Sequence, residues 1–330
     1  MRTSRIISTG RYVPSKVVTN DMMAEMVPTS DEWIRERSGI QQRHFVDSEI
    51  GVSDLSFEAA KIALERADMN AEDIDMIIFA TLSPDYMFPG SGVLLQEKLG
   101  IPGVPALDVR NQCSGFVYGL SVADQFIRTG MYDRIMLVGA EVHSTGLEYN
   151  ERGRHVTVLF GDGAGVAILG ASENGSGVLS THLHADGRYA LELCVTDPGS
   201  RKIPRINPDM FEDGSCYPHM NGREVFKHAI TKFPKVIKEA LDHNNLTTED
   251  IDLLIPHQAN LRISEAVAQR LNLRPEQMYN NIQRYGNTTA ASIPIALDEA
   301  LEKKLIKEND LVILAAFGSG FTWASAAIRW

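Results

Sequence analysis

Three residues of this 330-residue chain have types and positions suited to nucleophilic chemistry: Cys113, His257 and Asn287. Cys113 lies where an apolar run gives way to the amphipathic pattern of residues 116–129, which predicts a sulfur at a helix N-terminus. Unpaired N–H groups and the helix dipole favour a thiolate there, and a thiolate is a nucleophile. A free cysteine is also one of the residue types most often buried without a chemical role. Position alone leaves both interpretations open.

His257 and Asn287 lie at the ends of predicted elements in the second half of the chain. His257 follows the apolar run 251–255, and Asn287 precedes another helical pattern. Alone, such a histidine is more often a hydrogen-bonded structural residue, and such an asparagine is more often a helix cap. These two residues become candidates for a site only if the fold brings them to Cys113.

An internal repeat supplies that geometry. Residues 57–81 and 233–258 each predict an amphipathic helix, an acidic turn and a buried strand, and Glu-Asp-Ile-Asp occurs at 72–75 and again at 249–252. The offset is 177 residues. A second pair of similar segments has the same offset: 132–138 and 309–315. We therefore infer two similar α/β halves packed together.

The repeat places the cysteine and asparagine loops in equivalent positions. The offset carries Cys113 to position 290, three residues from Asn287, so the two loops should face each other across a pseudo-twofold axis. The glycine-rich run Phe317–Phe321 lets backbone N–H groups approach a ligand closely. We expect it to form half of an oxyanion hole with the N–H of Cys113. A Cys, His and Asn set also occurs in cysteine proteases, which require a different fold.

Each half alternates helices with short apolar strands, which indicates parallel strands covered on both faces. We place the boundary between residues 1–173 and 174–330 and expect a long surface loop at 197–220. Strands are expected nearest the junction, where α/β proteins bind ligands. Their predicted ranges are 103–110, 157–169, 281–284 and 311–317.

Composition excludes several classes of protein. The formal net charge of −11 argues against general nucleic-acid binding, and no apolar run is long enough to span a membrane. The three cysteines, Cys113, Cys194 and Cys216, are too few for a disulfide framework, so we expect a reducing, cytoplasmic location. Gly161–Gly165 lacks the residues of a phosphate-binding loop, and His182 and His184 lack further metal ligands.

Over essentially its whole length the sequence resembles the 3-oxoacyl-[acyl-carrier-protein] synthase III family of thiolase-fold condensing enzymes. The resemblance lies in long, ordered motifs. They are Thr29–Ile34 (TSDEWI), Phe160–Gly165 (FGDGAG), His182–Gly187 (HLHADG), Pro256–Arg262 (PHQANLR), Tyr285–Thr288 (YGNT) and Gly320–Trp323 (GFTW).

The resemblance implies a duplicated thiolase-like fold with five layers, α-β-α-β-α, and assigns roles to individual residues. It implies a catalytic triad of Cys113, His257 and Asn287, and Ser319 as the partner of Cys113 in the oxyanion hole. The other implied roles are coenzyme A binding by Trp33, Arg37, Arg152 and Asn260, carrier-protein binding by Gln258, Arg262, Lys227 and Arg270, and insertion of Phe88 into the acyl pocket of a second subunit.

The implied reaction is decarboxylative condensation of an acyl-CoA primer with malonyl-acyl carrier protein through an acyl-Cys113 intermediate, in a homodimer that needs no metal or redox cofactor. The family often has Ala-Cys-Ala-Gly-Phe where this chain has Gln112–Phe116, and Gly-Gly-Gly-Phe where it has Gly318–Phe321. These changes and the longer loop at 197–220 bear on the choice of primer. Alternatives are an acyltransferase or condensing enzyme of specialised metabolism and a non-catalytic subunit that binds acyl carrier protein.

Overall fold

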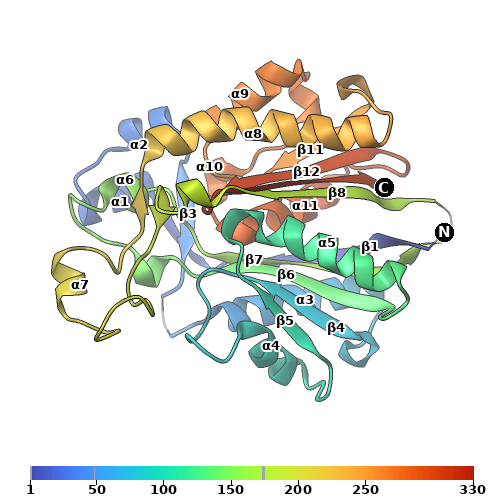
Figure 1. Ribbon diagram of the computed structural model, residues 1–330, viewed down its shortest axis with the longest axis horizontal. Coiled ribbons are helices and arrows are strands. Elements are labelled where there is room, and N and C mark those ends of the chain that lie inside the picture. Colours follow the sequence, from blue (N-terminus) through green and yellow to red (C-terminus); the bar gives the residue numbers. More distant parts are fainter. Residues whose placement is uncertain (1, 48, 173–174) are drawn as a thin grey trace.

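Two β-sheets form the frame of the molecule in the computed structural model, which describes residues 2–47, 49–172 and 175–330 (Figure 1). The first sheet has the strand order β1-β7-β6-β4-β5, with β4 parallel to β5 and β6 and with β7 antiparallel to β1 and β6. Its strands are β1 (Thr3–Tyr12), β4 (Met76–Ala80), β5 (Ala106–Val109), β6 (Arg134–Glu141) and β7 (Gly163–Ser172).

The second sheet repeats this arrangement with the order β8-β13-β12-β11. Its strands are β8 (Gly177–Ala185), β11 (Leu253–Pro256), β12 (Leu311–Gly318) and β13 (Thr322–Arg329). Strands β4 and β11 begin 177 residues apart, and so do β6 and β12. The predicted duplication is therefore confirmed.

Helices complete a stack of five layers, as Figure 1 shows. Helices α5 (Gly115–Arg128) and α11 (Ser292–Glu302) lie between the two sheets. Helices α3 (Val52–Ala67) and α4 (Ser91–Leu99) cover the outer face of the first sheet, while α8 (Gly222–His243) and α9 (Leu261–Leu271) cover the outer face of the second. The predicted α-β-α-β-α arrangement is confirmed.

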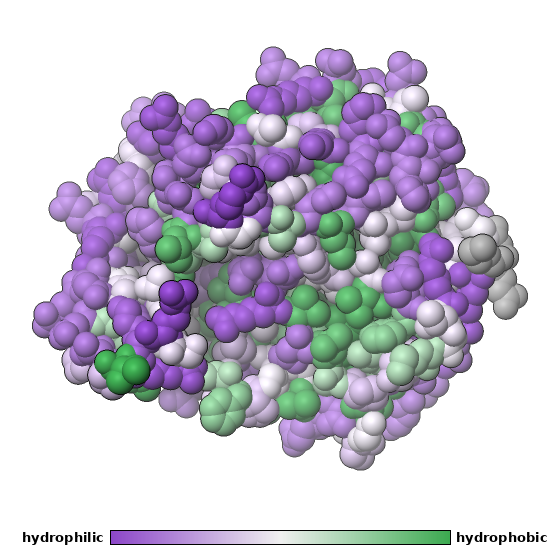
Figure 2. All heavy atoms as spheres, viewed as in Figure 1, coloured by the Kyte–Doolittle hydropathy of each residue, from purple (hydrophilic) through white to green (hydrophobic). Residues whose placement is uncertain are grey.

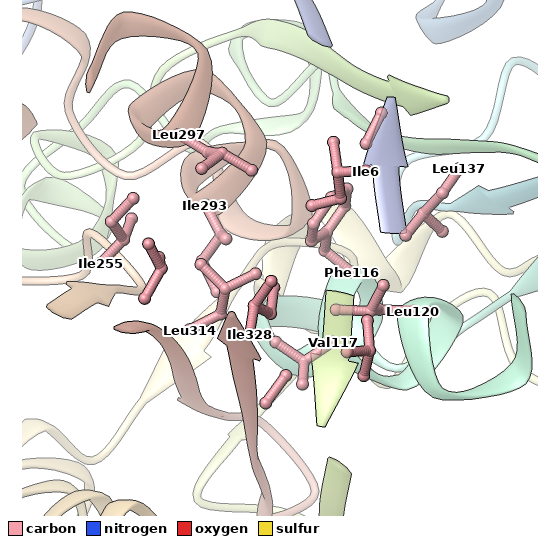
Figure 3. Packing of buried hydrophobic residues seen from close by; sticks show 14 of the residues in the cluster. Ile6, Phe116, Val117, Leu120, Leu137, Ile255, Ile293, Leu297, Leu314 and Ile328 are labelled. Atoms are coloured by element: carbon pink, nitrogen blue, oxygen red, sulfur yellow. The ribbon is translucent and has the colours of Figure 1, made fainter. Parts of the chain in front are cut away.

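The central helices pack against both sheets at once, because apolar residues occur on nearly every side of them. Figure 3 shows side chains of α5 and α11 between those of β6 and β12. The labelled members of this core are Ile6, Phe116, Val117, Leu120, Leu137, Ile255, Ile293, Leu297, Leu314 and Ile328, all at most 9% exposed. This rigid core fixes the starts of α5 and α11, where the candidate residues lie.

Shorter elements surround this frame. They are β2 (Lys16–Thr19), α1 (Asn20–Met26), α2 (Asp31–Ser38), β3 (Gln42–Phe45), η1 (Ala71–Asp73), η2 (Gln112–Ser114), η3 (Ser144–Gly146), α6 (Arg154–Thr157), η4 (Gly187–Tyr189), β9 (Leu193–Cys194), α7 (Asp209–Glu212), β10 (His219–Met220), η5 (Thr248–Asp250), η6 (Pro275–Gln277), α10 (Ile282–Tyr285) and η7 (Thr289–Ala291). Among the described helices, none combines the length and the apolarity that a bilayer crossing requires.

Two predictions about the elements near the junction need correction. The predicted strand at 281–284 is wrong, because this segment forms helix α10, whose first N–H groups donate to the side-chain oxygen of Gln258. The strand predicted from 157 begins only at Gly163, since α6 and a short loop precede it. The predicted boundary between residues 173 and 174 falls on residues outside those described.

Candidate active site

A cavity of about 790 Å³ lies at the junction of the two halves, and Cys113, His257 and Asn287 all line it. Cys113 belongs to η2 at the start of α5, His257 directly follows β11, and Asn287 lies just before η7. The fold therefore brings together the three residues that the sequence indicated.

Cys113 is held tightly against the end of β12. A Cβ atom at Gly318 would lie 2.5 Å from Cys113 Cβ and 2.8 Å from its sulfur, so only glycine fits there. The preceding residue, Gln112, has a left-handed φ of 42° that turns the chain into the helix. The backbone N–H groups of Ser319 and of Cys113 itself face the sulfur. This is the geometry expected of an oxyanion hole.

Burial determines the resting state of this cysteine. It raises the pKa of the Cys113 thiol to about 12, and the nearby Glu141 carboxylate acts in the same direction. The two backbone N–H groups favour the thiolate, as the helix-terminus argument predicted, but their effect is the smaller one. The resting side chain is therefore a thiol.

His257 is 2% exposed, and burial lowers its pKa to about 3, so its ring is neutral. Its Nδ1 lies 2.6 Å from the hydroxyl oxygen of Ser292, which is also 2.9 Å from the carbonyl oxygen of Thr289. Nε2 has no hydrogen-bond partner among the described residues. A buried, neutral imidazole with one free nitrogen can donate to, or accept from, a bound substrate.

Asn287 is oriented by its own loop. Its side-chain oxygen accepts a hydrogen bond of 2.9 Å from the N–H of Thr289, and its backbone N–H donates to Leu159 across 2.8 Å. Because the oxygen is already engaged, the side-chain NH₂ group is the part that remains to serve a ligand. Thr289, with a left-handed φ of 45°, thus fixes Asn287 through its N–H and Ser292 through its carbonyl.

Two buried carboxyl groups hold the surrounding loops. Glu141 accepts hydrogen bonds from Ser83 Oγ (2.6 Å) and from the N–H of Leu82 (3.2 Å), and burial raises its pKa to about 7. Asp162, in the glycine-rich motif, accepts from the N–H groups of Val46 (2.8 Å) and His143 (2.7 Å). The motif thus secures the loop that follows β6, as well as making a turn.

The predicted coenzyme A residues are only partly grouped. Arg37 lies over the ring of Trp33 at 4.7 Å, as expected for a site that combines an aromatic face with a cation. Arg152 does not join them, because its guanidinium pairs with Glu148 and donates to the carbonyl oxygen of Glu212 at 2.6 Å. Arg154, not Arg152, lies over the ring of Trp33, at 5.2 Å.

Asn260 joins this region to the cavity. It caps α9 through the N–H of Arg262, its side-chain NH₂ donates to the carbonyl oxygen of Arg37 at 2.8 Å, and it lines the cavity. Gln258 requires a correction, because it is 2% exposed and its side chain bonds to the backbone of Pro256 and Asn281. Gln258 therefore shapes the loop and cannot contact a carrier protein.

The other predicted carrier-protein residues lie on the outer helices. Lys227 on α8, and Arg262 and Arg270 on α9, are exposed to solvent. In the view of Figure 2, the upper part of the surface, where Figure 1 places these helices, is predominantly hydrophilic. Phe88 is 82% exposed and does not line the cavity of its own chain.

The predicted surface loop at 197–220 contributes Asp197, Arg205 and Cys216 to the cavity wall, and Cys194 also lines it. No group of His, Cys, Asp or Glu residues within the described ranges could hold a metal ion.

Sequence reasoning missed His143, Thr289, Ser292 and Arg154. The offset of 177 could have indicated Thr289 and Ser292, since it maps them onto Gln112 and Gly115 beside the cysteine. His143 carried no sequence signal, because its place in the cavity depends on how the loop after β6 folds.

Comparison with known proteins gives one consistent result. Models of 3-oxoacyl-[acyl-carrier-protein] synthase III and of its C-terminal part match residues 107–187 and 241–330. The chain is 47% identical to a β-ketoacyl-[acyl-carrier-protein] synthase III of Alkalilimnicola ehrlichii over the full length of both, and 46% identical to that of Caldanaerobacter subterraneus over 98% of this chain and 97% of the other. The crystal structure of 3-oxoacyl-[acyl-carrier-protein] synthase III from Aquifex aeolicus superposes with a TM-score of 0.91 at 39% identity, covering 99% of this chain and all of the other.

Proposed function

This chain belongs to the 3-oxoacyl-[acyl-carrier-protein] synthase III family, and on that premise we propose that Cys113, His257 and Asn287 perform its chemistry. The protein is an acyltransferase that condenses an acyl-CoA with malonyl-acyl carrier protein and initiates fatty-acid synthesis. The observation that carries the residue assignment is the shared cavity, whose wall holds a thiol, an imidazole nitrogen without a hydrogen-bond partner among the described residues, and an amide group.

The first step is acylation of Cys113. The acyl-CoA enters past Trp33 and Arg37, and the sulfur forms a bond to the thioester carbon while the bond to coenzyme A breaks. Because the thiol is protonated at rest, its proton must leave as the bond forms, and it ends on the departing coenzyme A thiol. The oxyanion of the intermediate accepts hydrogen bonds from the N–H groups of Cys113 and Ser319.

The second step is decarboxylation of the malonyl group. Loss of CO₂ leaves an enolate, whose oxygen accepts hydrogen bonds from His257 Nε2 and from the NH₂ group of Asn287. In the resting site Ser292 donates its hydroxyl proton to the carbonyl oxygen of Thr289, and Nε2 carries the ring proton once this hydroxyl turns to donate to Nδ1. The enolate carbon then attacks the acyl-Cys113 carbonyl, 3-oxoacyl-carrier protein forms, and Cys113 leaves as a thiolate that takes up one proton from solvent.

The binding partners follow from the surface. Coenzyme A would bind at Trp33, Arg37 and Arg154, and an acidic carrier protein would dock on the cationic side chains of α8 and α9, including Lys227 and Arg262. We retain Arg270 as a more distant contributor to that docking surface. This chemistry suits the cytoplasm, where acyl-CoA and acyl carrier protein occur.

A homodimer is supported by the edge of the first sheet. Strand β5 is the edge strand, and hydrophobic residues gather in the lower middle of the face in Figure 2, where Figure 1 places β5. Exposed apolar side chains nearby include Phe88, Val93 and Leu107. Pairing of two β5 edges would cover this surface and bring Phe88 toward the cavity of the second subunit.

The test is product formation from purified protein, malonyl-acyl carrier protein and acyl-CoAs of two to ten carbons. We expect stoichiometric CO₂ and 3-oxoacyl-carrier protein from at least one primer, and neither product from Cys113→Ser. Acyl transfer without CO₂ release would favour a non-decarboxylating acyltransferase. Absence of any acyl transfer would favour a binding subunit.

A further inference from the structure

His143 is a buried side chain of the cavity to which the condensation gives no role. It lies in the loop after β6 and is 6% exposed. Its ring packs at a tilt against the ring of Phe160, and the two ring centroids are 4.4 Å apart. Its backbone N–H donates to Asp162 across 2.7 Å. The ring is therefore held in one orientation within the wall.

The two ring nitrogens of His143 differ in their surroundings. Nε2 lies 2.8 Å from the hydroxyl oxygen of Thr289, whereas Nδ1 has no hydrogen-bond partner among the described residues. Burial lowers the pKa of His143 to about 3, so the ring is neutral. The Thr289 hydroxyl has no other acceptor within the described ranges, so it donates to Nε2 and the ring proton lies on Nδ1. An unpaired N–H group is thus left at the cavity wall.

The position of His143 distinguishes it from groups that would bind coenzyme A. Asn260 and its neighbours on α8 and α9 line the side of the cavity that adjoins Arg37. His143 belongs to the part of the wall that the loops after β4 and β6 provide. The apolar residues of that wall are Leu82, Met87, Val142, Leu147, Leu159 and Phe160. An acyl chain on Cys113 would extend along this wall.

We propose that this wall selects primers whose acyl chain carries one uncharged oxygen, a hydroxyl or an oxo group, which accepts a hydrogen bond from His143 Nδ1. The inference rests on the proposed function, because it concerns the acyl group that Cys113 receives. A mostly apolar wall with a single oriented polar group is typical of a site that recognises one polar substituent on an apolar ligand. The cavity of about 790 Å³ is also large enough for a chain well beyond two carbons.

A neutral oxygen suits this wall better than a carboxylate. The neutral imidazole supplies no charge, and the arginines that line the cavity, Arg110 and Arg205, are exposed to solvent. A primer without the oxygen leaves the Nδ1 N–H unpaired when the chain excludes water, and a site built for a hydrogen bond discriminates against such analogues.

The experiment compares acyl-CoAs that differ only in the substituent. Octanoyl-CoA, 3-hydroxyoctanoyl-CoA, 5-hydroxyoctanoyl-CoA, 5-oxooctanoyl-CoA and 7-carboxyheptanoyl-CoA are mixed with the full-length protein, and the rate of acylation of Cys113 is followed by intact-protein mass spectrometry. We expect the best oxygenated primer to react roughly tenfold faster than octanoyl-CoA. In His143→Leu this ratio should fall to about one, with octanoyl-CoA as the internal reference for folding. His243→Leu, which removes an exposed imidazole outside the cavity, should keep the wild-type ratio.

The possible results distinguish failure of this inference from failure of the proposed function. A wild-type ratio near one, a ratio unchanged in His143→Leu, or a preference for the carboxylated primer would overturn the inference. If octanoyl-CoA acylates Cys113 and malonyl-acyl carrier protein then removes the acyl group, the proposed function stands whatever the ratio. If no primer of either kind modifies Cys113, the proposed function fails and the inference fails with it.

Discussion

The loop that carries Cys113 and the loop 287–292 are two copies of one structure with different chemistry. Gln112 and Thr289 lie 177 residues apart and have left-handed φ values of 42° and 45°. Each opens a short 3₁₀ helix that leads into a central helix, α5 or α11. Where the first loop has Cys113, however, the second has Ala290. The duplication kept the backbone that exposes a side chain at the junction and gave the nucleophile to one copy only.

At two further equivalent positions, the polar side chains belong to the second half. His257 at the end of β11 corresponds to Ala80 at the end of β4, and Ser292 corresponds to Gly115. In the second half Ser292 lies 2.6 Å from the imidazole, whereas in the first half a Cβ atom at Gly115 would meet that of Ala80 at 3.1 Å. Close apolar packing thus replaces a polar contact. In the proposed mechanism, the first half provides acylation and the second provides decarboxylation.

The largest expected effect comes from removing the nucleophile of the first half. Cys113→Ala should abolish acyl-enzyme formation, because Ala290 in the equivalent position offers no alternative. Incubation with acyl-CoA followed by intact-protein mass spectrometry measures this directly. Acylation at Cys194 or Cys216 in the variant would show that the cavity has a second nucleophile. The conclusion that only the Cys113 loop provides a nucleophile would then be wrong.

A large loss is also expected from Gly318→Ala. The added methyl group would lie 2.5 Å from Cys113 Cβ, so the cysteine or the end of β12 must shift, and the acylation rate should fall by about a hundredfold. Gly146→Ala is the matched control, since it also lines the cavity but its Cβ would meet no atom within 4 Å. Equal rates in the two variants would refute the close fit around the sulfur.

Ser292→Ala should affect only the second half. Without the hydroxyl, His257 Nδ1 loses its hydrogen-bond partner and the imidazole loses its fixed orientation, so decarboxylation should slow by about tenfold while acylation is unchanged. Stopped-flow acylation and CO₂ release measure the two steps separately. Ser325→Ala, another buried hydroxyl that bonds to Val236 at 2.7 Å outside the cavity, controls for lost stability. A slower acylation in Ser292→Ala would contradict the division of labour.

The smallest expected effect is on stability against acid. His143 and His257 have folded-state pKa values of about 3, below the roughly 6.5 of an unfolded histidine, so the unfolded chain binds more protons between these values. Stability is therefore lost as pH falls from about 6.5 toward 3, by about 1.4 kcal/mol per pH unit for each histidine. Glu141, whose pKa is raised to about 7, acts in the opposite sense above about pH 4.5.

Comparison of wild type with His143→Leu isolates one of these histidines, because the Glu141 contribution is common to both. The variant's unfolding free energy, from urea titrations between pH 6 and 5, should decline less steeply by about 1.4 kcal/mol per pH unit. Parallel curves would mean that His143 becomes protonated in the folded state.

The sequence predicted the fold well because the repeat and the apolar strands are local patterns that recur at one offset. It also placed Cys113, His257 and Asn287 together, since an offset of 177 fixes which loops meet. It did not indicate that Gln258 is buried, because its hydrogen bonds depend on α10, nor that Arg154 and not Arg152 lies beside Trp33. Burial and loop register are tertiary properties that residue spacing does not encode.

The central claim, that the two halves perform separate steps, is tested most directly with Asn287→Asp. The purified variant is mixed with an acyl-CoA that the wild type accepts, its mass is measured, and malonyl-acyl carrier protein is added. Our account predicts full acylation of Cys113 in both proteins and removal of the acyl group only in wild type, with condensation in the variant reduced by about a hundredfold or more, because the enolate loses a donor. Failure of the variant to become acylated would contradict the claim.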